Sequence, residues 1–483
     1  MKAVFVHDQE AAVEGLKSGE KIEAMDSEYG RNELLVDFLR ELGVWDALTS
    51  MKTTKKPNGK PQDALSGAVV LFSLAHLGAL EKADPVLRDG LLMTEAGFTL
   101  KEVKEATKQN KGVVHRDTLR NHLQRIPMEE SKRAFYRCLE LFRSKKLIRG
   151  KVYAADGFKI RVYGKTYEGA GKAYDPDEKE TIRGYKVVIL LNLTPEREYV
   201  VGCAIGPVQA DERDLLREIL DDLERHGIPP KSLIDILVMD RGYWGADFLN
   251  ELKSKYGIDY LTLVPRNVSL YDDVILRVGS GDLPLKEVKL VKNGGFTVTG
   301  VGYLPGFDAE NESGKKVLRC NVVYSRGIDD EGKEFDMVFA TSHQDLRPEA
   351  YVKLYWRRWV IENEGIRHLS QVWGIKKPIS RKLDAIFANI VMILCLSNSV
   401  RAFEAKYPKE KDSTKEKMRR RGQKSHLLDR GCIVFLPEKR IYAVMSAVEF
   451  ARLVKERTMR KFKRLLSSGL STEEAMEEVM REL

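Results

Sequence analysis

Two kinds of hydrophobic patterning divide the chain. From 32 to 143, apolar residues recur every three to four positions, as around Leu35 and Leu39, and this spacing predicts an α-helical region. From Lys151 onward, runs of β-branched and aromatic residues replace that pattern, and such runs are typical of strands. Residues 1–30 are polar and poorly patterned, and we interpret them as an irregular arm.

The strand-like part of the chain contains two helical segments. These are Asp211–His226 and Trp244–Tyr256. The strand-like runs around them are 152–156, 158–163, 185–193, 199–208, 233–240 and 259–265. Four strands before the first helix, followed by alternation, predict a mixed sheet in an α/β (α+β) fold and not a strictly alternating doubly wound fold.

In the second half of the chain the pattern of apolar and polar residues changes twice more. Residues 270–345 hold short strand-like runs such as 273–278, separated by Gly-rich and Asp-rich breaks, which predicts an all-β insertion. Helical patterning returns at 348–372 and again at 385–403. From 405 the chain reads as a basic linker followed by helices, with a capping box at Ser471.

Composition narrows the class of protein. Of the 483 residues, 43% are hydrophobic and 32% are charged, which excludes a mainly disordered, collagen-like or membrane-embedded chain. The net charge is +9. Part of the basic excess lies in 406–424, with nine Lys or Arg against three Asp or Glu. A local excess of this kind fits a polyanionic partner.

Other features point to a reducing, membrane-free setting. The five cysteines contain no C-x-x-C pair, so neither a zinc ribbon nor a disulfide framework is indicated. The N-terminus has no apolar signal segment. The apolar stretches Ala64–Leu80 and Ala385–Leu396 are shorter than the roughly 20 residues that span a bilayer, so we interpret both as buried core helices. We expect a cytoplasmic protein.

The helical N-terminal region holds a candidate helix-turn-helix. Thr99 and Glu102 form a capping-box pattern, residues 109–112 break the helix, and a second helix follows from about Arg116 to Arg125. On the second helix Arg116, Arg120 and Asn121 are the side chains suited to DNA, since Arg and Asn match the edges of G and A. The alternative is a solvated face on a plain helical bundle.

Two aspartates stand at strand ends. Asp156 lies in VYAADGFKI, where Asp-Gly between apolar runs also fits a hairpin turn. Asp240 follows the run LIDILVM, at the end of a strand where α/β folds place reactive groups; it also fits a helix N-cap. Of the other carboxylates, Asp211 and Glu212 are interpreted as the N-cap and first turn of a helix, and Asp175 as solvated in a polar loop.

A third feature lies on the helix at 348–372. Tyr355, Arg358 and Glu362 are spaced by three and four residues, which places them on one helical face. An ordinary surface ion pair would have the same spacing. The surroundings favour a nucleic-acid groove: from 353 to 382 there are eight Lys or Arg, two Asp or Glu, and three of the five tryptophans.

Taken together, these motifs resemble the DDE transposases of the IS4 family of insertion sequences, over roughly residues 150–400. The matching pieces are the early strand aspartate Asp156, the D-R-G-Y that starts at Asp240, and the Y-x2-R-x3-E formed by Tyr355, Arg358 and Glu362. The family also carries a β-rich insertion before its glutamate. One departure is Leu369, which stands seven residues after Glu362 where the family usually has a lysine.

The resemblance implies an RNase H-like core in which Asp156, Asp240 and Glu362 are catalytic and hold two Mg²⁺ ions, with Mn²⁺ as a substitute. Carboxylates are the ligands that two-metal phosphodiester chemistry requires. It implies DNA contacts by Tyr355 and Arg358, and we add Arg241. We hypothesise that Lys376 or Lys377 supplies the charge that Leu369 lacks.

The resemblance thus implies a DNA transposase that binds terminal inverted repeats, cleaves them and transfers the strand, as a homodimer on double-stranded DNA. It also implies a prokaryotic protein associated with the nucleoid. The alternatives are a structure-specific nuclease on the same fold and a catalytically decayed transposase that only binds DNA. The expected domains are a helical DNA-binding domain at 1–148, the first part of the catalytic core at 149–269, the insertion at 270–345, the helical second part at 346–404, and the linker with its C-terminal helices at 405–483.

Overall fold

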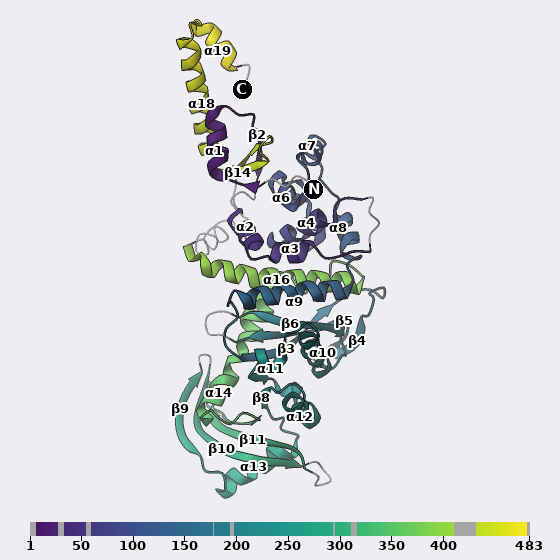
Figure 1. Ribbon diagram of the computed structural model, residues 1–483. Helices are drawn as coiled ribbons and strands as arrows, with labels where there is room; N and C mark the ends of the chain where they lie inside the picture. The colour runs from purple at the N-terminus through teal and green to yellow at the C-terminus, as the bar shows by residue number, and fades with distance from the viewer. Residues whose placement is uncertain are drawn as a thin grey trace. The chain divides into compact units, whose positions relative to one another are not determined.

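The computed structural model describes residues 6–27, 33–54, 59–176, 178–193, 198–292, 295–310, 316–409 and 431–480. The chain divides into two compact units (Figure 1). Unit 1 comprises Met1–Cys138, Val372–Gly374 and Asp384–Leu483, and unit 2 comprises Leu139–Gln371 and Ile375–Leu383. The chain passes from unit 1 to unit 2 within helix α9.

Unit 1 is mainly helical, as the spacing of its apolar residues predicts. The capping box at Thr99 is confirmed, because the Thr99 side chain and Glu102 each bind the other's backbone N–H. The capping box at Ser471 is confirmed in the same way with Glu474. The helical elements are α1 (Gln9–Ser18), α2 (Glu33–Glu41), α3 (Val44–Thr49), α4 (Gln62–Leu74), η1 (Leu80–Lys82), α5 (Asp84–Arg88), α6 (Gly90–Ala96), α7 (Leu100–Lys108), α8 (Arg116–Leu123), α9 (Met128–Ser144), α16 (Leu383–Lys406), α18 (Ala447–Ser467) and α19 (Thr472–Met480).

Unit 1 also contains a four-stranded sheet that sequence patterning missed. Its strands are β1 (Val6–His7), β14 (Ile441–Met445), β13 (Gly431–Leu436) and β2 (Glu23–Ser27), paired in that order. The expected irregular arm at 1–30 is therefore wrong for its described part, which forms β1, α1 and β2. Its strands find their partners more than 400 residues away in the chain, a pairing that local periodicity cannot reveal. The expected basic linker lies largely in 410–430, outside the described residues.

Unit 2 is built on one mixed sheet of ten strands (Figure 1). The strand order is β4-β5-β3-β7-β8-β12-β11-β10-β9, and β6 also pairs with β5. The expected mixed α/β fold is confirmed. Its strands are β3 (Val152–Arg161), β4 (Gly171–Asp175), β5 (Glu180–Asn192), β6 (Val200–Pro207), β7 (Ile236–Met239), β8 (Asp259–Leu263), β9 (Lys286–Lys292), β10 (Phe296–Glu310), β11 (Lys316–Ile328) and β12 (Glu334–Thr341).

The centre of this sheet is parallel, because β3, β7 and β8 run in one direction. All four residues of β7 are buried, as expected for a strand covered on both faces. Helix α10 packs against β5, β6 and β3, and its apolar residues recur at 215, 216, 219, 220 and 223. The helical elements of this unit are α10 (Glu212–Arg225), α11 (Pro230–Leu233), η2 (Arg241–Tyr243), α12 (Ala246–Ser254), α13 (Ser269–Ser280), α14 (Pro348–Arg357), η3 (Ile361–Arg367) and α15 (His368–Gln371).

The strands of 270–345 do not form a separate sheet. They continue the central sheet, because β12 pairs antiparallel with β8. The strand expected at 273–278 is wrong, since these residues lie in α13. A short apolar run of this length does not distinguish a strand from a helix. Here Gly281, with a φ of 83°, ends the helix in the left-handed conformation that favours glycine.

The helix expected at 348–372 is interrupted. Helix α14 ends at Arg357, a π-helical segment η3 follows, and α15 completes the run. Single-turn π segments are often found at functional sites. This one carries Glu362.

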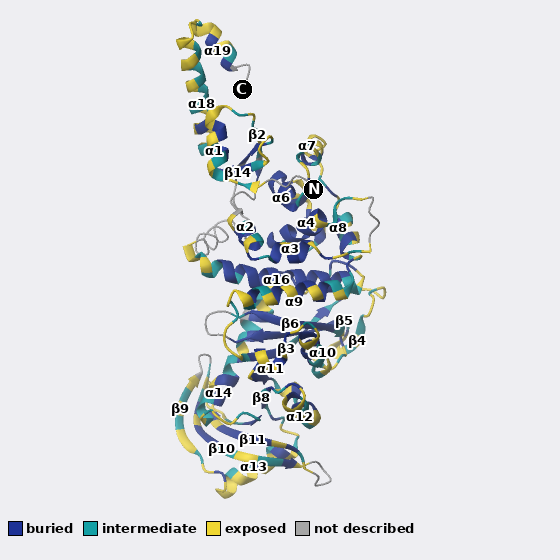
Figure 2. Ribbon diagram, in the orientation of Figure 1, coloured by how far each residue is buried: buried dark blue, intermediate teal, exposed yellow. Residues whose placement is uncertain are grey.

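Helix α16 is long and apolar enough to cross a membrane, judged by length and composition alone. Of the most apolar stretch of 18 residues in this helix, 89% is buried. Figure 2 shows α16 mostly in the colour of buried residues. That burial agrees with the expected core helix around 385–396.

Candidate active site

The strands β3 and β7 bring two of the predicted acids to one place. The last register pair between these parallel strands is Ala155 with Met239, so Asp156 and Asp240 are the next residues on the two neighbouring strands. The hairpin turn considered for Asp156 is wrong, because β3 continues through Asp156 and Gly157, both paired with β5. Beyond Ala155, β3 has no register partner on β7, and Asp156 stands where the two strands part.

Arg358 connects Asp156 to the third predicted acid. Its Nη1 lies 2.8 Å from Oε1 of Glu362 and 3.5 Å from Oδ2 of Asp156. The guanidinium is buried, with 6% of the side chain exposed. The Nε of Arg358 is also buried and has no hydrogen-bond partner among the described residues. One arginine thus binds two acids that lie about 200 positions apart in the sequence, and it keeps one donor unused.

Tyr355 reaches the remaining acid. Its hydroxyl donates to Oδ1 of Asp240 at 3.2 Å, and Thr262 donates to the Asp240 carbonyl at 3.1 Å. The Tyr355 ring packs against Phe339 of β12, with ring centroids 4.9 Å apart. We expected Tyr355 to contact DNA, but it is buried and its hydroxyl holds Asp240. The packing shows how the strands of 270–345 support the site.

Burial governs the electrostatics of these acids. Burial raises the pKa of Asp156 to about 7, while Arg358 and the Gly157 N–H lower it and the carboxylates of Glu362 and Glu212 raise it further. Burial lowers the pKa of Arg358, but Tyr355, Asp240, Asp156 and Glu362 raise it more, so the guanidinium stays charged. The raised pKa of Asp156 therefore comes chiefly from its burial, and Arg358 is the strongest influence in the opposite direction.

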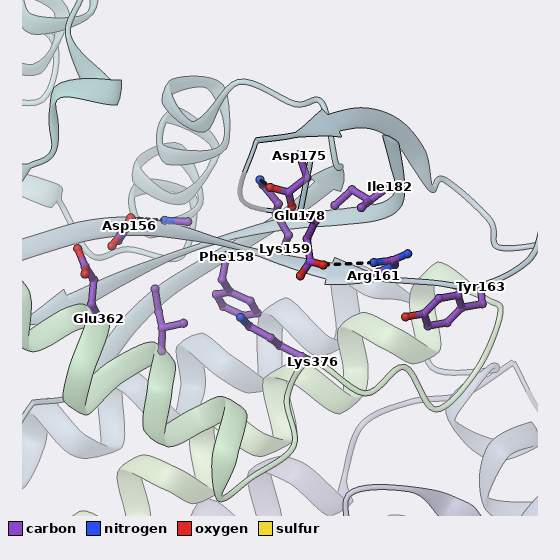
Figure 3. Close-up of a pocket in the computed structure, with 12 residues that line it drawn as sticks. Asp156, Phe158, Lys159, Arg161, Tyr163, Asp175, Glu178, Ile182, Glu362 and Lys376 are labelled. Carbon is purple, nitrogen blue, oxygen red and sulfur yellow. Dashed lines mark hydrogen bonds and ion pairs between the residues drawn. The ribbon is translucent and has the colours of Figure 1, made fainter. Parts of the chain in front are cut away.

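Asp156 and Glu362 line an open cleft of about 710 Å³ in unit 2, where Figure 3 shows the two carboxyl groups at one end. The cleft follows β3 outward past Lys159 and Arg161. Lys376 lies on its wall, with Nζ 5.8 Å from the ring centroid of Phe158. Further along, the cleft is lined by both cations and acids, namely Lys159, Arg161, Lys376, Asp175 and Glu178. The cations suit a polyanion whose reacting phosphate lies at Asp156 and Glu362.

Some cations in the cleft already have partners. Lys159 pairs with Asp175 at 2.9 Å, and Arg161 pairs with Glu180 at 2.6 Å. Asp175 is buried at the end of β4, so its expected solvated position in a loop is wrong. The strand β4 has only five residues. That length is too short for the alternation of apolar and polar positions to reveal a strand in the sequence.

The remaining predicted residues of unit 2 differ in exposure. Arg241, in η2, and Lys377 are exposed. Leu369 is buried, with 1% of its surface exposed, so it is a core residue at the position where a lysine was expected.

In unit 1 the second helix of the candidate helix-turn-helix forms as expected. Leu119 and Leu123 are buried and Asn121 is exposed. The two arginines already have protein partners. Arg120 pairs with Asp117 and, at 2.7 Å, with Glu81, and Arg116 donates to the Glu81 carbonyl at 3.2 Å.

The carboxylates suit a divalent metal by their chemistry, since Mg²⁺ takes oxygen ligands from one or two carboxylates each. Within the described residues, no three His, Cys, Asp or Glu side chains stand close enough to hold an ion as they are. The Arg358 guanidinium lies between Asp156 and Glu362. Asp156 is largely buried and its pKa is raised chiefly by that burial, and a cation bound beside it would favour its charged form.

A family model for the transposase DDE domain matches residues 148–399, which is more than half of the chain. The chain belongs to this family. No curated protein matches it. Membership in the DDE transposase family means an enzyme of the transposase and nuclease kind whose partner is DNA, and such enzymes generally use divalent metal ions. The matched region contains Asp156, Asp240 and Glu362.

One acidic residue close to this site was not chosen from the sequence. Asp211 is the N-cap of α10, as expected, but Glu212 does more than open the helix. It lies beside Gly157, next to Asp156. The signal in the sequence was the glycine, because Gly157 sits in a strand where a glycine often marks a close approach.

Proposed function

We propose that this DDE transposase cleaves DNA at the ends of an insertion sequence and transfers the freed strand to a target. The observation that carries the proposal is the gathering of Asp156, Asp240 and Glu362 around Arg358 and Tyr355. Membership in the IS4 group is part of the proposal and rests on the Y-x2-R-x3-E motif.

In this proposal Asp156, Asp240 and Glu362 would hold two Mg²⁺ ions, with Mn²⁺ as a substitute. Bound there, the ions would supply positive charge at the phosphate and at the attacking and leaving oxygens. Arg358 must then leave the carboxylates at least in part, and a phosphate oxygen is a natural new acceptor for its unused Nε. Tyr355 acts as a positioning residue, because its hydroxyl fixes the orientation of Asp240.

The proposed reaction has two steps of the same kind. In the first, water attacks the phosphorus at the element end, a new P–O bond forms, and the bond to the 3′ oxygen breaks as that oxygen takes a proton. In the second, the freed 3′ hydroxyl attacks a phosphorus in the target strand and displaces that strand's 3′ oxygen. Residues 1–148, with α8, would bind the inverted repeats, and the protein would act as a homodimer in the cytoplasm.

A cleavage assay tests the proposal. The full chain is incubated with Mg²⁺ or Mn²⁺ and a supercoiled plasmid that carries the DNA flanking its own gene. We expect cuts at the element end and joined products. Asp156→Asn, Asp240→Asn and Glu362→Gln should each abolish cleavage and leave DNA binding in place. Glu349→Gln, on the neighbouring α14, is the matched control and should cleave normally.

The alternatives give different products. A structure-specific nuclease would cut the plasmid without producing joined strands. A decayed transposase would bind the plasmid and leave it intact with either metal ion. Cleavage that persists in Asp156→Asn would reject the assignment of the acids.

A further inference from the structure

Helix α18 in unit 1 carries a concentration of positive charge that neither the active site nor α8 accounts for. Between residues 451 and 467 the chain has seven Lys or Arg and one acid, Glu456. This helix lies outside the region that the DDE family model matches, which ends at residue 399. Figure 1 shows α18 beside α1 and leading into α19. The charge on α18 therefore needs an explanation of its own.

One side of α18 packs within unit 1 and uses two of the seven cations. Leu453 is buried in an apolar cluster with residues of α1, β13 and β14. Arg457 donates to the carbonyl of Gly19 at 3.3 Å. Lys461 donates to the carbonyl of Glu478 at 3.3 Å. These two cations bind the ends of α1 and α19, so their role is structural.

The other five cations of this segment are exposed, and they are Arg452, Lys455, Arg460, Lys463 and Arg464. Because successive residues of an α-helix are about 100° apart, Arg452, Lys455 and Lys463 share one side of α18. At a rise of about 1.5 Å per residue, this side is about 17 Å long from 452 to 463. One strand of a DNA duplex carries about five phosphates over that length.

Acids neutralise little of this surface. Glu456 lies 3.9 Å from Arg452 and 3.8 Å from Arg460, and 44% of the Glu456 side chain is exposed. Lys455 and Lys463 form no ion pair within the part of the chain that the structure describes. Exposed pairs as long as those of Glu456 break at little cost. The positive charge on this side of α18 is therefore available to a partner.

The arginines of α8 are less available than these cations. Arg120 pairs with Asp117 and with Glu81, and Arg116 donates to the Glu81 carbonyl. Of the two helices, α18 thus has the row of cations that a phosphate backbone requires. No pattern in the sequence had singled out this helix for DNA.

We propose that the exposed side of α18 is a second DNA-binding surface, which contacts backbone phosphates and reads no bases. Lysine and arginine contacts to phosphate position a protein on DNA without carrying sequence information. DNA is the partner that the family implies, and it matches both the charge and the length of this surface. The inference goes beyond the proposed function, because it concerns a region outside the catalytic domain and requires no cleavage.

The test measures the affinity of the full chain for a random-sequence duplex at several salt concentrations, without divalent metal. The double variant Lys455→Ala, Lys463→Ala should reduce the slope of log affinity against log salt by about 1.8, since each phosphate contact contributes about 0.9. The double variant Lys455→Arg, Lys463→Arg keeps both charges and should keep the slope. An unchanged slope in the alanine variant overturns the proposal.

Lys231→Ala is the control for losing a charge elsewhere. Lys231 is exposed in α11, which precedes β7 and so lies at the other end of that strand from Asp240. This variant should leave the slope unchanged. If it lowers the slope as much as Lys455→Ala alone does, the net charge of the chain sets the affinity, and the proposal is overturned.

Glu456→Gln should have an effect of the opposite sign. It removes the one acid that lies between Arg452 and Arg460, so binding to the random duplex should tighten and the slope should steepen. Glu140→Gln, at an exposed position of α9, changes the net charge equally and should leave the affinity unchanged. Equal tightening in both variants would contradict a local surface on α18.

Exposed apolar residues on α18 suggest two competing partners. Val448 is 81% exposed and Met459 is 46% exposed. A basic helix with such residues also suits an anionic membrane surface, and a second copy of the chain would cover them as well. Binding to vesicles of anionic lipid and sedimentation of the free protein measure these alternatives. If Lys455→Ala, Lys463→Ala loses vesicle binding or self-association and keeps its salt slope on DNA, the proposal is wrong.

Failure of this inference is distinguishable from failure of the proposed function, because DNA binding is measured without the metal that cleavage needs. A chain that cleaves plasmid DNA and keeps its full slope in Lys455→Ala, Lys463→Ala loses only the surface on α18. A chain whose slope falls in that variant and that never cleaves DNA loses only the transposase activity.

Discussion

Arg358 in unit 2 and Arg120 in unit 1 look alike in the sequence and differ in the structure. Each has an acid one helical turn away, Glu362 for Arg358 and Asp117 for Arg120, and each pairs with it. The second partner of Arg358 is Asp156, 202 residues away, and 6% of the Arg358 side chain is exposed. The second partner of Arg120 is Glu81, and 27% of the Arg120 side chain is exposed.

The difference shows what makes an ion pair informative about function. Exposed pairs contribute about 0–1 kcal/mol, so those of Arg120 can be exchanged for a DNA contact at little cost. A buried arginine is costly to desolvate and needs several acids around it. The acids around Arg358 come from β3, from the residue that follows β7, and from η3. Their convergence indicates a site, whereas the spacing of Arg358 and Glu362 alone would not.

Of the two arginines, Arg358 should show the larger effect. Arg358→Lys keeps the charge but loses the planar fork, so we expect cleavage to fall by roughly 10²–10³-fold, the loss typical of a removed transition-state donor. DNA binding should change much less. Rates measured with saturating flanking DNA test this. If Arg120→Ala, assayed under the same conditions, slows cleavage as strongly, the contrast between the two arginines does not hold.

Variants of Leu369 test whether this chain could accept a lysine at the position where the family usually has one. Because the side chain is buried, Leu369→Ala should destabilise the protein by about 2–5 kcal/mol. Leu369→Lys should cost at least as much, since it buries an unpaired charge. Urea unfolding measures both, with the exposed Leu276→Ala as control. A stable Leu369→Lys variant with tighter DNA binding would contradict the assignment of Leu369 to the core.

The features that the sequence predicted and those that it missed differ in the same way. Features set by nearby residues were predicted, and features set by residues far apart in the chain were missed. The mixed sheet of unit 2, the strand-end position of Asp240 and both capping boxes were predicted, because each depends on neighbours in the chain. The sheet of unit 1 was missed, because β1 pairs with β14 and β2 with β13 across the whole chain. Glu212 was assigned only to a helix start, because its proximity to Gly157 depends on how α10 packs.

Arg120 offers the next effect in size. Arg120→Ala should weaken binding to the flanking DNA of the gene by about 1–3 kcal/mol if the side chain reads a base, and should weaken binding to random DNA less. If it meets only phosphate, both DNAs should lose affinity equally. Asp117→Asn removes one local partner of Arg120 and should strengthen binding to random DNA slightly. No change on either DNA in Arg120→Ala would return α8 to a structural role.

Lys376 and Lys377 should give the smallest effect. They test whether lysines at or near the cleft contact DNA phosphates. Both are exposed, and Lys376 lines the cleft that holds Asp156 and Glu362. A phosphate contact changes the logarithmic dependence of affinity on salt by about 0.9 for each charge neutralised. Lys376→Ala should therefore lower the slope by about one, and Lys377→Ala by less. Lys382→Ala, whose side chain faces Glu168 at 3.7 Å, is the control.

If the double Lys376→Ala, Lys377→Ala variant keeps the full slope, neither lysine replaces the charge that Leu369 lacks. DNA binding in the cleft would then depend on Arg358 and on cations that must first leave their acidic partners, such as Lys159 and Arg161.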